Sequence, residues 1–345
     1  MKSVAILLFL LASATRTIGI SFLHDESRIP EQDNLRLAGK VIDGNSKQPV
    51  PYVNIGLFEK NLGTLSDLDG SFELIVPMQY GNDTVIFSSI GYKRLRVIAS
   101  KLLGAATEEI LLVPEIILLS DVVVTGKKYK KQRLGWMGGK DGVLPLDTLQ
   151  GGGAVALLLE SPRSTSYIDK LQVRLMYNSK DTLRFRLHFY AYDSIRDIPG
   201  AELLRKEVML TETKRFGWLR FDLANQDIRI YEKKFLVGFE WIDDRKTRRE
   251  MLAGLRDWER WKKAQFETGN KKVEMIGSAK STQYKYHGNM MDWPGFKSLP
   301  PFTGLMVETG KSNDTKLLRT FERKTSFGKW NEIHSTLNAV VTVSY

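Results

Sequence analysis

The sequence predicts an all-β protein made of two β-sandwiches in series, the second of which carries one helical insertion. Three observations lead to this prediction. Apolar and polar residues alternate along many short segments, which is the period of a strand with one buried face. Turn signals such as Asp43-Gly44-Asn45 and Asp69-Gly70 separate these segments. One stretch, Asp243 to Glu267, changes instead to the three-and-four spacing of an amphipathic helix.

The first residues of the chain indicate export. Lys2 supplies a positive charge, Val4 to Leu11 form an apolar run too short to span a bilayer, and Ala12-Ser13-Ala14 is a cleavage signal. We therefore expect a signal peptide at residues 1–19 and a polar linker at 20–35. The expected location is the periplasm or the outer-membrane surface of a bacterium. The rest of the chain has no run apolar enough to predict a transmembrane helix.

Length and composition narrow the class of protein further. The 345 residues are enough for two domains. The formal net charge of +11 would suit a nucleic acid, an anionic surface or an acidic polymer, and it would equally suit a solvated basic surface. Export argues against a nucleic-acid partner. The chain has no cysteine, so it can form no disulfide and its stability must come from core burial.

A first sandwich is expected over residues 36–125. The segments "LRLAGKV", "YVNIGLF" and "SFELIVP" each place apolar residues on one face, and "DTVIFSSIGY", "KRLRVIA" and "EEILLVP" continue the pattern. Pro49 and Pro51 precede a strand, where a missing N–H is tolerated. Gly91 permits a turn that a β-carbon would oppose. Phe72 and Tyr92 have the size of core residues in a small sandwich.

These residues resemble the carboxypeptidase-regulatory-like domain. The resemblance implies a seven-stranded transthyretin-like β-sandwich, of the type that precedes many TonB-dependent outer-membrane receptors of the Bacteroidetes. It also implies protein contacts at the cell envelope. Leu119 to Lys127, "LSDVVVTGK", resembles the segment that closes this domain in those receptors. The other shared elements, in the order of the family, are Gly39-x-Val41, Pro49 to Ile55, Gly63-Thr64, Asp69-Gly70-x-Phe72 and Ile90-Gly91-Tyr92.

Two aspartates in "GTLSDLDGSFELIVP" could belong to a calcium loop or to a turn. An EF-type loop needs oxygen ligands at its first, third, fifth and twelfth positions and glycine at the sixth. With Gly70 in the sixth position, the first and twelfth positions hold Leu65 and Val76, which are apolar. This favours a hairpin turn over Asp67 to Gly70. The histidines are dispersed and lack the spacing of a zinc peptidase, so we predict no metal site and no cofactor.

Residues 126–152 are basic and rich in glycine, and we expect them to link the two domains. Basic clusters can bind nucleic acid or lipid head groups, but an exposed connector is the favoured interpretation. The cluster comprises Lys127, Lys128, Lys130, Lys131 and Arg133.

The second sandwich, expected over residues 153–345, has a jelly-roll-like pattern. "DKLQVRLMYNSKDTLRFRLHFYAYD" predicts a hairpin whose two strands each turn an apolar face inward. A helix is expected at about 245–267. Its Trp258 and Trp261 are either a ligand platform or, as we favour, residues that pack the helix on its sheet. Trp293 lies in a loop, "MMDWPGF", and is expected to be exposed.

The outward face of the second strand of that hairpin is the main candidate binding site. It carries Arg184, Arg186, His188, Tyr190 and Tyr192. Cations combined with aromatic rings can hold an anionic sugar or a carboxylate polymer. A solvated strand face is the alternative. Trp293 completes the set of candidate ligand-binding residues.

The chain has none of the motifs of the common catalytic sites, such as Gly-x-Ser-x-Gly or His-Glu-x-x-His. The leading hypothesis is therefore a non-enzymatic exported binding or scaffolding protein of the cell envelope. Its partner would be an envelope protein or a carbohydrate, with possible association with the outer membrane. The alternative is a polysaccharide hydrolase whose site lies in the rear domain. Paired carboxylates for such chemistry could come from Glu240, Asp243 and Asp244.

Overall fold

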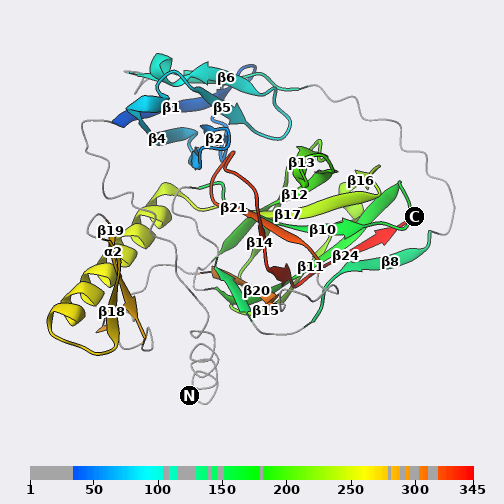
Figure 1. Ribbon diagram of the computed structural model, residues 1–345. Helices are drawn as coiled ribbons and strands as arrows, with labels where there is room; N and C mark the ends of the chain where they lie inside the picture. Colours follow the sequence, from blue (N-terminus) through cyan, green and yellow to red (C-terminus); the bar gives the residue numbers. More distant parts are fainter. Residues whose placement is uncertain are drawn as a thin grey trace.

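The computed structural model contains a front sandwich, a rear sandwich and a projecting arm (Figure 1). The predicted signal peptide, nearly all of the predicted linker at 20–35 and the segment 119–127 lie outside the described residues. Within the described ranges, no helix combines the length and the hydropathy of a membrane span. These ranges are 34–103, 109–115, 129–138, 142–145, 151–178, 182–278, 281–287, 293–294, 303–309 and 318–345.

The front domain is the seven-stranded sandwich that the sequence predicts. One sheet has the order β4–β1–β7 and the other the order β3–β2–β5–β6. Alternate side chains meet between the sheets, where the Phe72 and Phe87 rings lie edge to face with centroids 5.4 Å apart. Tyr92 packs against this core, and its hydroxyl donates to Asp43 Oδ2 at 2.9 Å. The strands are β1 (Asn34–Asp43), β2 (Asn54–Leu57), β3 (Leu62–Leu65), β4 (Ser71–Pro77), β5 (Thr84–Ser88), β6 (Leu95–Ile98) and β7 (Glu109–Leu112).

The turn at Asp67 to Gly70 is confirmed, but the hairpin around it is wrong. Gly70 has a φ of +78°, which favours glycine, and its N–H donates to the carbonyl oxygen of Asp67 at 2.9 Å. However, β3 and β4 belong to different sheets. The turn therefore carries the chain from one layer of the sandwich to the other. A turn signal specifies the reversal of the chain but not the sheet that the next strand joins.

The rear domain is a larger sandwich of two sheets. One has the order β13–β12–β17–β10–β21–β22, with β14 paired to β12. The other has the order β23–β20–β11–β24–β8, with β15 and β16 paired to β11 and β9 paired to β20. The strands are β8 (Lys131–Gly135), β9 (Gly142–Pro145), β10 (Ala154–Glu160), β11 (Ser166–Asn178), β12 (Leu183–Asp193), β13 (Ile198–Glu202), β14 (Val208–Glu212), β15 (Gly217–Asp222), β16 (Arg229–Ile230), β17 (Lys234–Trp241), β20 (Thr303–Thr309), β21 (Thr320–Arg323), β22 (Asn331–Ile333), β23 (Ser335–Leu337) and β24 (Ala339–Ser344).

Two expectations about this domain need correction. The predicted hairpin is wrong, because β11 and β12 lie in opposite sheets and face each other across the core. Each strand does turn its predicted apolar face inward. The predicted connector at 126–152 is also partly incorporated into the sandwich. Lys131–Gly135 pairs with the C-terminal strand, and Gly142–Pro145 pairs with β20.

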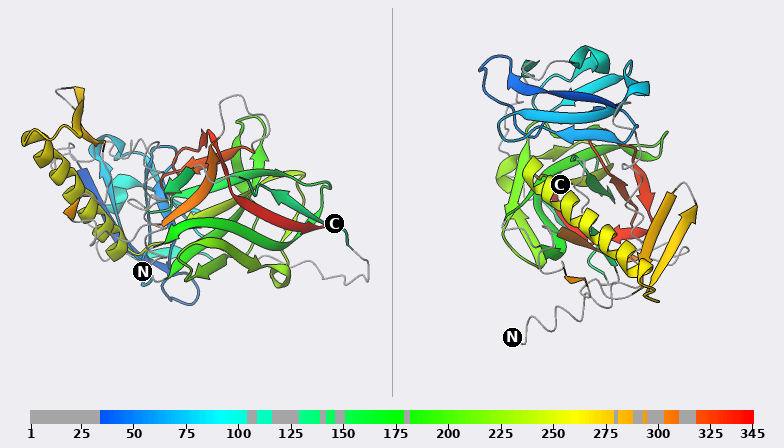
Figure 2. Two further views of the ribbon diagram at one scale, coloured as in Figure 1. Left: turned by 90° about the horizontal axis from the view of Figure 1, so that it is seen from below. Right: turned by 90° about the vertical axis from the view of Figure 1, so that its left-hand side faces the viewer.

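The arm consists of helix α2 (Arg245–Glu267) and the hairpin of β18 (Val273–Ser278) and β19 (Ser281–Tyr286). It projects from one side of the two sandwiches (Figure 2). The predicted helix is confirmed. Asp244 caps its N-terminus by accepting the N–H of Thr247 at 2.7 Å.

Aromatic side chains hold the arm together. Trp258 stacks on Trp261 at a centroid distance of 5.1 Å, and both meet the edge of Tyr286 from the hairpin. The packing interpretation of this tryptophan pair is therefore correct, although the helix packs mainly on its own hairpin rather than on a sandwich sheet. Trp293 was expected to be exposed, and this is wrong. Its ring is 7% exposed and lies 5.4 Å from that of Trp258.

Candidate functional site

The front domain contacts the strand face that the sequence singles out. On β12, Arg186, His188 and Tyr190 are buried, while Arg184 remains exposed and Tyr192 is half-buried. Arg186 contacts the front domain, and Trp330 of the rear domain packs on Tyr190. The expectation of an outward, solvent-facing set is thus wrong for the three central residues. Alternation separates the two faces of a strand, but it does not reveal that a second domain covers one of them.

A row of charged side chains crosses this face of the sheet. The strand register places Arg186 of β12 opposite Glu240 of β17, with Ala154 of β10 and Arg323 of β21 next in line. Such paired residues share one face of the sheet. Arg186 Nη1 lies 3.2 Å from Glu240 Oε2, and its Nε lies 2.7 Å from an oxygen of Glu207.

The front domain reaches into this row. Arg186 Nη2 donates to the carbonyl oxygen of Tyr52 at 2.5 Å, and the side-chain amide of Asn54 donates to Glu240 Oε2 at 3.4 Å. Arg186 is 1% exposed and Glu240 is fully buried. A buried charge is tolerated when it is paired and hydrogen-bonded, as both are here. The row therefore joins the two domains.

His188 lies between two carboxylates. Its Nδ1 is 2.5 Å from Glu202 Oε2 and its Nε2 is 2.7 Å from Glu240 Oε2. Both ring nitrogens can donate only when the ring is protonated. Burial opposes the charge, but Glu202 and Glu240 outweigh burial and raise the pKa of His188. Burial likewise opposes ionisation of Glu240, yet Arg186 and His188 lower the pKa of that carboxyl to about 2.

These pKa shifts predict how stability depends on pH. The contribution of His188 is fully present below its unfolded pKa of about 6.5 and is lost as pH rises through its folded value. The contribution of Glu240 is present above about pH 4.5 and is lost as pH falls towards about 2. We expect His188→Gln to lose the most stability, relative to wild type, at about pH 5 to 6, with a smaller difference at alkaline pH. Urea unfolding across this range tests it, and a pH-independent difference would contradict it.

Beside the row of charged side chains, the ring of Tyr190 lies across Gly238 of β17. Its ring stacks on that of His188, with centroids 5.1 Å apart and an interplanar angle of 11°. A β-carbon on Gly238 would lie 2.7 Å from the Tyr190 ring. Only glycine at this position of β17 leaves room for the tyrosine. Trp330, from the loop between β21 and β22, packs on Tyr190 in a T-shaped arrangement with ring centroids 5.6 Å apart.

That loop, residues 324–330, forms a clasp that enters the front domain. Ser326 Oγ lies 2.6 Å from Asn54 Oδ1 and 2.9 Å from the carbonyl oxygen of Thr64. β-Carbons on Gly56, Gly63 and Gly152 would each come within 2.7 Å of Ser326 atoms. Close approach of a foreign backbone is a common reason for glycine inside a strand. The glycines of β2 and β3 are thus the sequence signal that could have revealed the clasp.

The aspartate of the Asp67 turn joins the front domain to the arm. Asp67 Oδ1 accepts the backbone N–H of Arg245 at 2.9 Å, and its Oδ2 lies 2.8 Å from the guanidinium of the same residue. Arg248 lies 3.8 Å away, and Arg249 lies 3.7 Å from Glu73. A carboxylate at the positive end of a helix dipole is favourable. The motif that suggested a calcium loop therefore binds a helix N-terminus.

A matched pair of variants tests this anchor. Asp67→Ala should destabilise the first turns of α2 by about 1–2 kcal/mol, because it removes a charge-assisted cap contact. Asp69→Ala is the control, since among the described residues the Asp69 side chain accepts hydrogen bonds only from Ser71, at 2.7 Å and 3.0 Å. Amide hydrogen exchange should accelerate over the start of α2 in the first variant alone. Equal acceleration in both variants would contradict the anchor.

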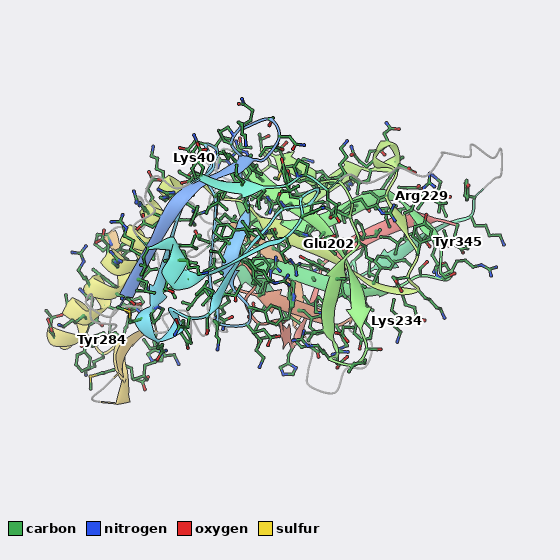
Figure 3. All side chains as sticks on the ribbon, turned by 90° about the horizontal axis from the view of Figure 1, so that it is seen from above. Lys40, Glu202, Arg229, Lys234, Tyr284 and Tyr345 are labelled. Atoms are coloured by element: carbon green, nitrogen blue, oxygen red, sulfur yellow. The ribbon has the colours of Figure 1, made fainter. Side chains whose placement is uncertain are left out.

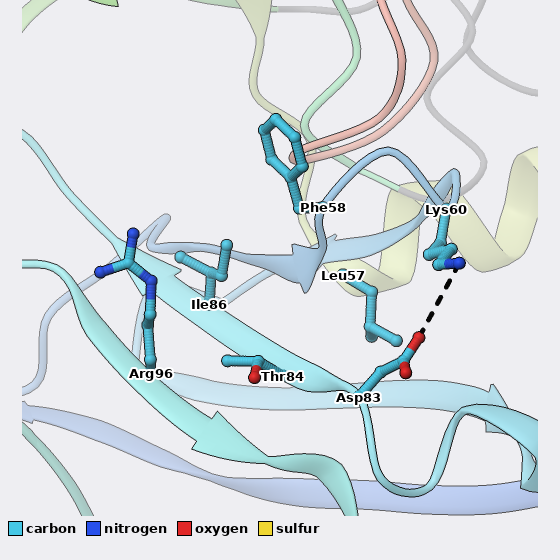
Figure 4. Close-up of a pocket in the computed structure, with 7 residues that line it drawn as sticks. All are labelled: Leu57, Phe58, Lys60, Asp83, Thr84, Ile86 and Arg96. Carbon is cyan, nitrogen blue, oxygen red and sulfur yellow. Dashed lines mark ion pairs between the residues drawn. The ribbon is translucent and has the colours of Figure 1, made fainter.

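The described residues also form a small surface cavity of about 270 Å³ on the four-stranded front sheet (Figure 4). Ile86 and Leu57 supply apolar lining, while Lys60 and Asp83 form an ion pair at 4.0 Å beside it. Arg96 and Phe58 contribute further rim atoms. Ligand pockets usually measure about 300–1,000 Å³. This cavity could therefore hold only a small fragment.

The acidic residues proposed for polysaccharide hydrolysis do not form a suitable site. A glycosidic acid needs a raised pKa and access to its substrate. Glu240 is fully buried, and its pKa is lowered. Asp244 caps α2, and Asp243 is buried. Among the residues described, no group of three or more potential ligand side chains is arranged to hold a metal ion.

Fold and site together define a two-domain β-sandwich protein with a charged domain interface. Comparison with known proteins identifies its front domain. Residues 37–124 match the family model of the CarboxypepD_reg-like domain, as the sequence motifs predict. No curated protein matches the chain.

Among solved structures, the viral particle of infectious bursal disease virus (IBDV, T13 form) is 10% identical, with a TM-score of 0.23. The alignment covers 90% of this chain and 62% of the viral one. The VP2 subviral particle of the same virus is 10% identical, with a TM-score of 0.22 and coverage of 90% and 64%. The chain thus spans less than two thirds of these proteins, and likenesses this weak support no statement about its fold or function.

Proposed function

We propose that the chain is an exported, non-enzymatic scaffolding protein of the bacterial cell envelope. The observation that carries the proposal is the use of the polar face of β12. Arg186, a cation that could have formed part of a ligand site, instead joins the rear domain to the front one, and His188 and Tyr190 are buried beside it. A carboxypeptidase-regulatory-like domain is a binding or scaffold type of domain, and here it is fixed in orientation by the row of charges and the clasp.

The outer sheet of the front domain is the proposed contact surface for an envelope protein. The sheet β4–β1–β7 is the layer that does not meet the clasp, which binds β2 and β3. Two apolar side chains of this sheet lie outside the core and are exposed, Ile75 at 55% and Leu111 at 45%. Large exposed apolar patches mark interaction sites, and we propose that Ile75 and Leu111 belong to such a contact surface.

Site-specific photo-cross-linking in the native cell tests this function. A photoreactive amino acid at Leu111 should give a discrete protein adduct in the envelope fraction. The same group at Ile195, which is 95% exposed on the rear domain, is the control and should give none. Recovery of the protein only from the cytoplasm would overturn the envelope location. Hydrolysis of any glycan in a broad panel by the purified protein would overturn the non-enzymatic assignment.

A further inference from the structure

The far end of the arm exposes apolar side chains that its own packing does not cover. Phe266, Met275 and Ile276 are 37%, 52% and 39% exposed. Tyr284 belongs to the same end, because it pairs with Met275 across the hairpin and its ring lies 5.4 Å from that of Phe266. Figure 3 places Tyr284 beside the far end of α2. Met275 and Tyr284 share one face of the hairpin, and Ile276 lies on the other. We refer to Phe266, Met275, Ile276 and Tyr284 as the arm tip.

Four lysines lie close to the arm tip along the chain. Lys263, Lys271, Lys272 and Lys285 are all exposed. The nearby acids are already engaged, since Glu267 pairs with Lys263 at 3.7 Å and Glu274 with His287 at 2.8 Å. Within the described part of the chain, Lys271 and Lys285 have no carboxylate partner. The local excess of positive charge agrees in sign with the net charge of +11 for the whole chain.

We propose that the arm tip inserts into an anionic lipid surface. Apolar and aromatic groups flanked by lysines match the boundary between head groups and acyl chains, where lysine stems bury their methylenes and keep their charges in water. Lysines near anionic lipids add electrostatic attraction. A protein partner fits less well, because a stable protein interface takes about 20 residues a side. This proposal depends on the proposed function in one respect, namely that a protein of the cell envelope lies beside a membrane.

Vesicle sedimentation of the purified full chain tests whether the lysines near the arm tip attract anionic lipid. The protein should sediment with vesicles of equal parts phosphatidylcholine and phosphatidylglycerol, and not with phosphatidylcholine alone. Lys271→Gln with Lys285→Gln should weaken binding about 25-fold, since each lysine near the surface accounts for about fivefold. Lys93→Gln with Lys101→Gln removes the same charge from the front domain and should change binding less than about threefold. Equal loss in both double variants would mean general charge attraction and would overturn the proposal.

The insertion part has a separate test, which uses the absence of cysteine from the chain. Ile276→Cys and Lys101→Cys each allow one label that fluoresces more strongly in apolar surroundings. Anionic vesicles should raise the emission about twofold or more at position 276 and leave it unchanged at 101. No change at 276, or the same change at both, overturns insertion. Cross-linking of position 276 to a protein without vesicle binding would assign the arm tip to that protein and overturn the proposal, while a Leu111 adduct would still support the proposed function.

Discussion

Arg186→Met should lower the free energy of unfolding by about 3–5 kcal/mol, the cost of breaking a buried ion pair by removing one partner. The variant leaves Glu240 fully buried without its guanidinium and leaves the Tyr52 carbonyl without its donor. Methionine keeps most of the apolar stem, so the loss comes mainly from charge and hydrogen bonding. Urea unfolding measures it, and limited proteolysis should show that the two domains separate.

Arg184→Met is the matched control for that experiment. It lies two positions away on the same strand, carries the same side chain and is exposed. A surface substitution of this kind should change the free energy of unfolding by about 0.5 kcal/mol or less. Arg186→Lys adds a second comparison, since lysine keeps the charge but cannot reach Glu207, Glu240 and Tyr52 with one planar fork. Equal losses for the Arg184 and Arg186 variants would show that the row does not join the domains.

Gly152→Ala should release the clasp. The new β-carbon would lie 1.9 Å from Ser326 Oγ, at a residue whose φ of +74° already disfavours alanine. Ser326 must then move away from Asn54 and Thr64. We expect a loss of about 3 kcal/mol or more, the sum of backbone strain and the lost interface contacts. Thermal unfolding should divide into two transitions as the domains lose their coupling.

Gly217→Ala is the control that measures backbone strain without a steric clash. Gly217 also has a positive φ, of +98°, but a β-carbon there would meet nothing within 4 Å. This variant should lose only the strain contribution, about 1–2 kcal/mol, and should unfold in one transition. A single transition in both variants, with similar losses, would mean that the clasp does not hold the domains together.

Local features of the sequence predict much of the fold. Alternation identifies the strands and their buried faces, and the spacing of Trp258 and Trp261 identifies the helix. The same alternation cannot tell a hairpin from two strands in opposite sheets, and for that reason β11 and β12 were wrongly paired. Both arrangements bury the same side chains. Trp293 stands alone in a loop with no period, and it packs on Trp258, which lies 35 residues earlier in the chain.

The candidate site was predicted less well than the fold. Sequence pattern brought Arg186, His188 and Tyr190 together on one face, and the structure confirms that grouping. It could not supply Glu202 and Glu207, which come from other segments, or the front domain that covers the face. A polar strand face looks the same in sequence whether water or another domain lies against it. The glycines inside β2 and β3 were the available sign of a close neighbour.

Asp67 holds one end of helix α2 against the front domain, and the other end extends away from that contact. The 23 residues of the helix extend about 35 Å from the contact with Asp67, at about 1.5 Å per residue. If the front domain rotated by a few degrees and the helix moved with it, the far end of the helix would therefore be displaced several times further than its first turn. Arg245 and Arg248 both engage Asp67, and Arg249 engages Glu73, so front-domain carboxylates contact the first turns of the helix at several points.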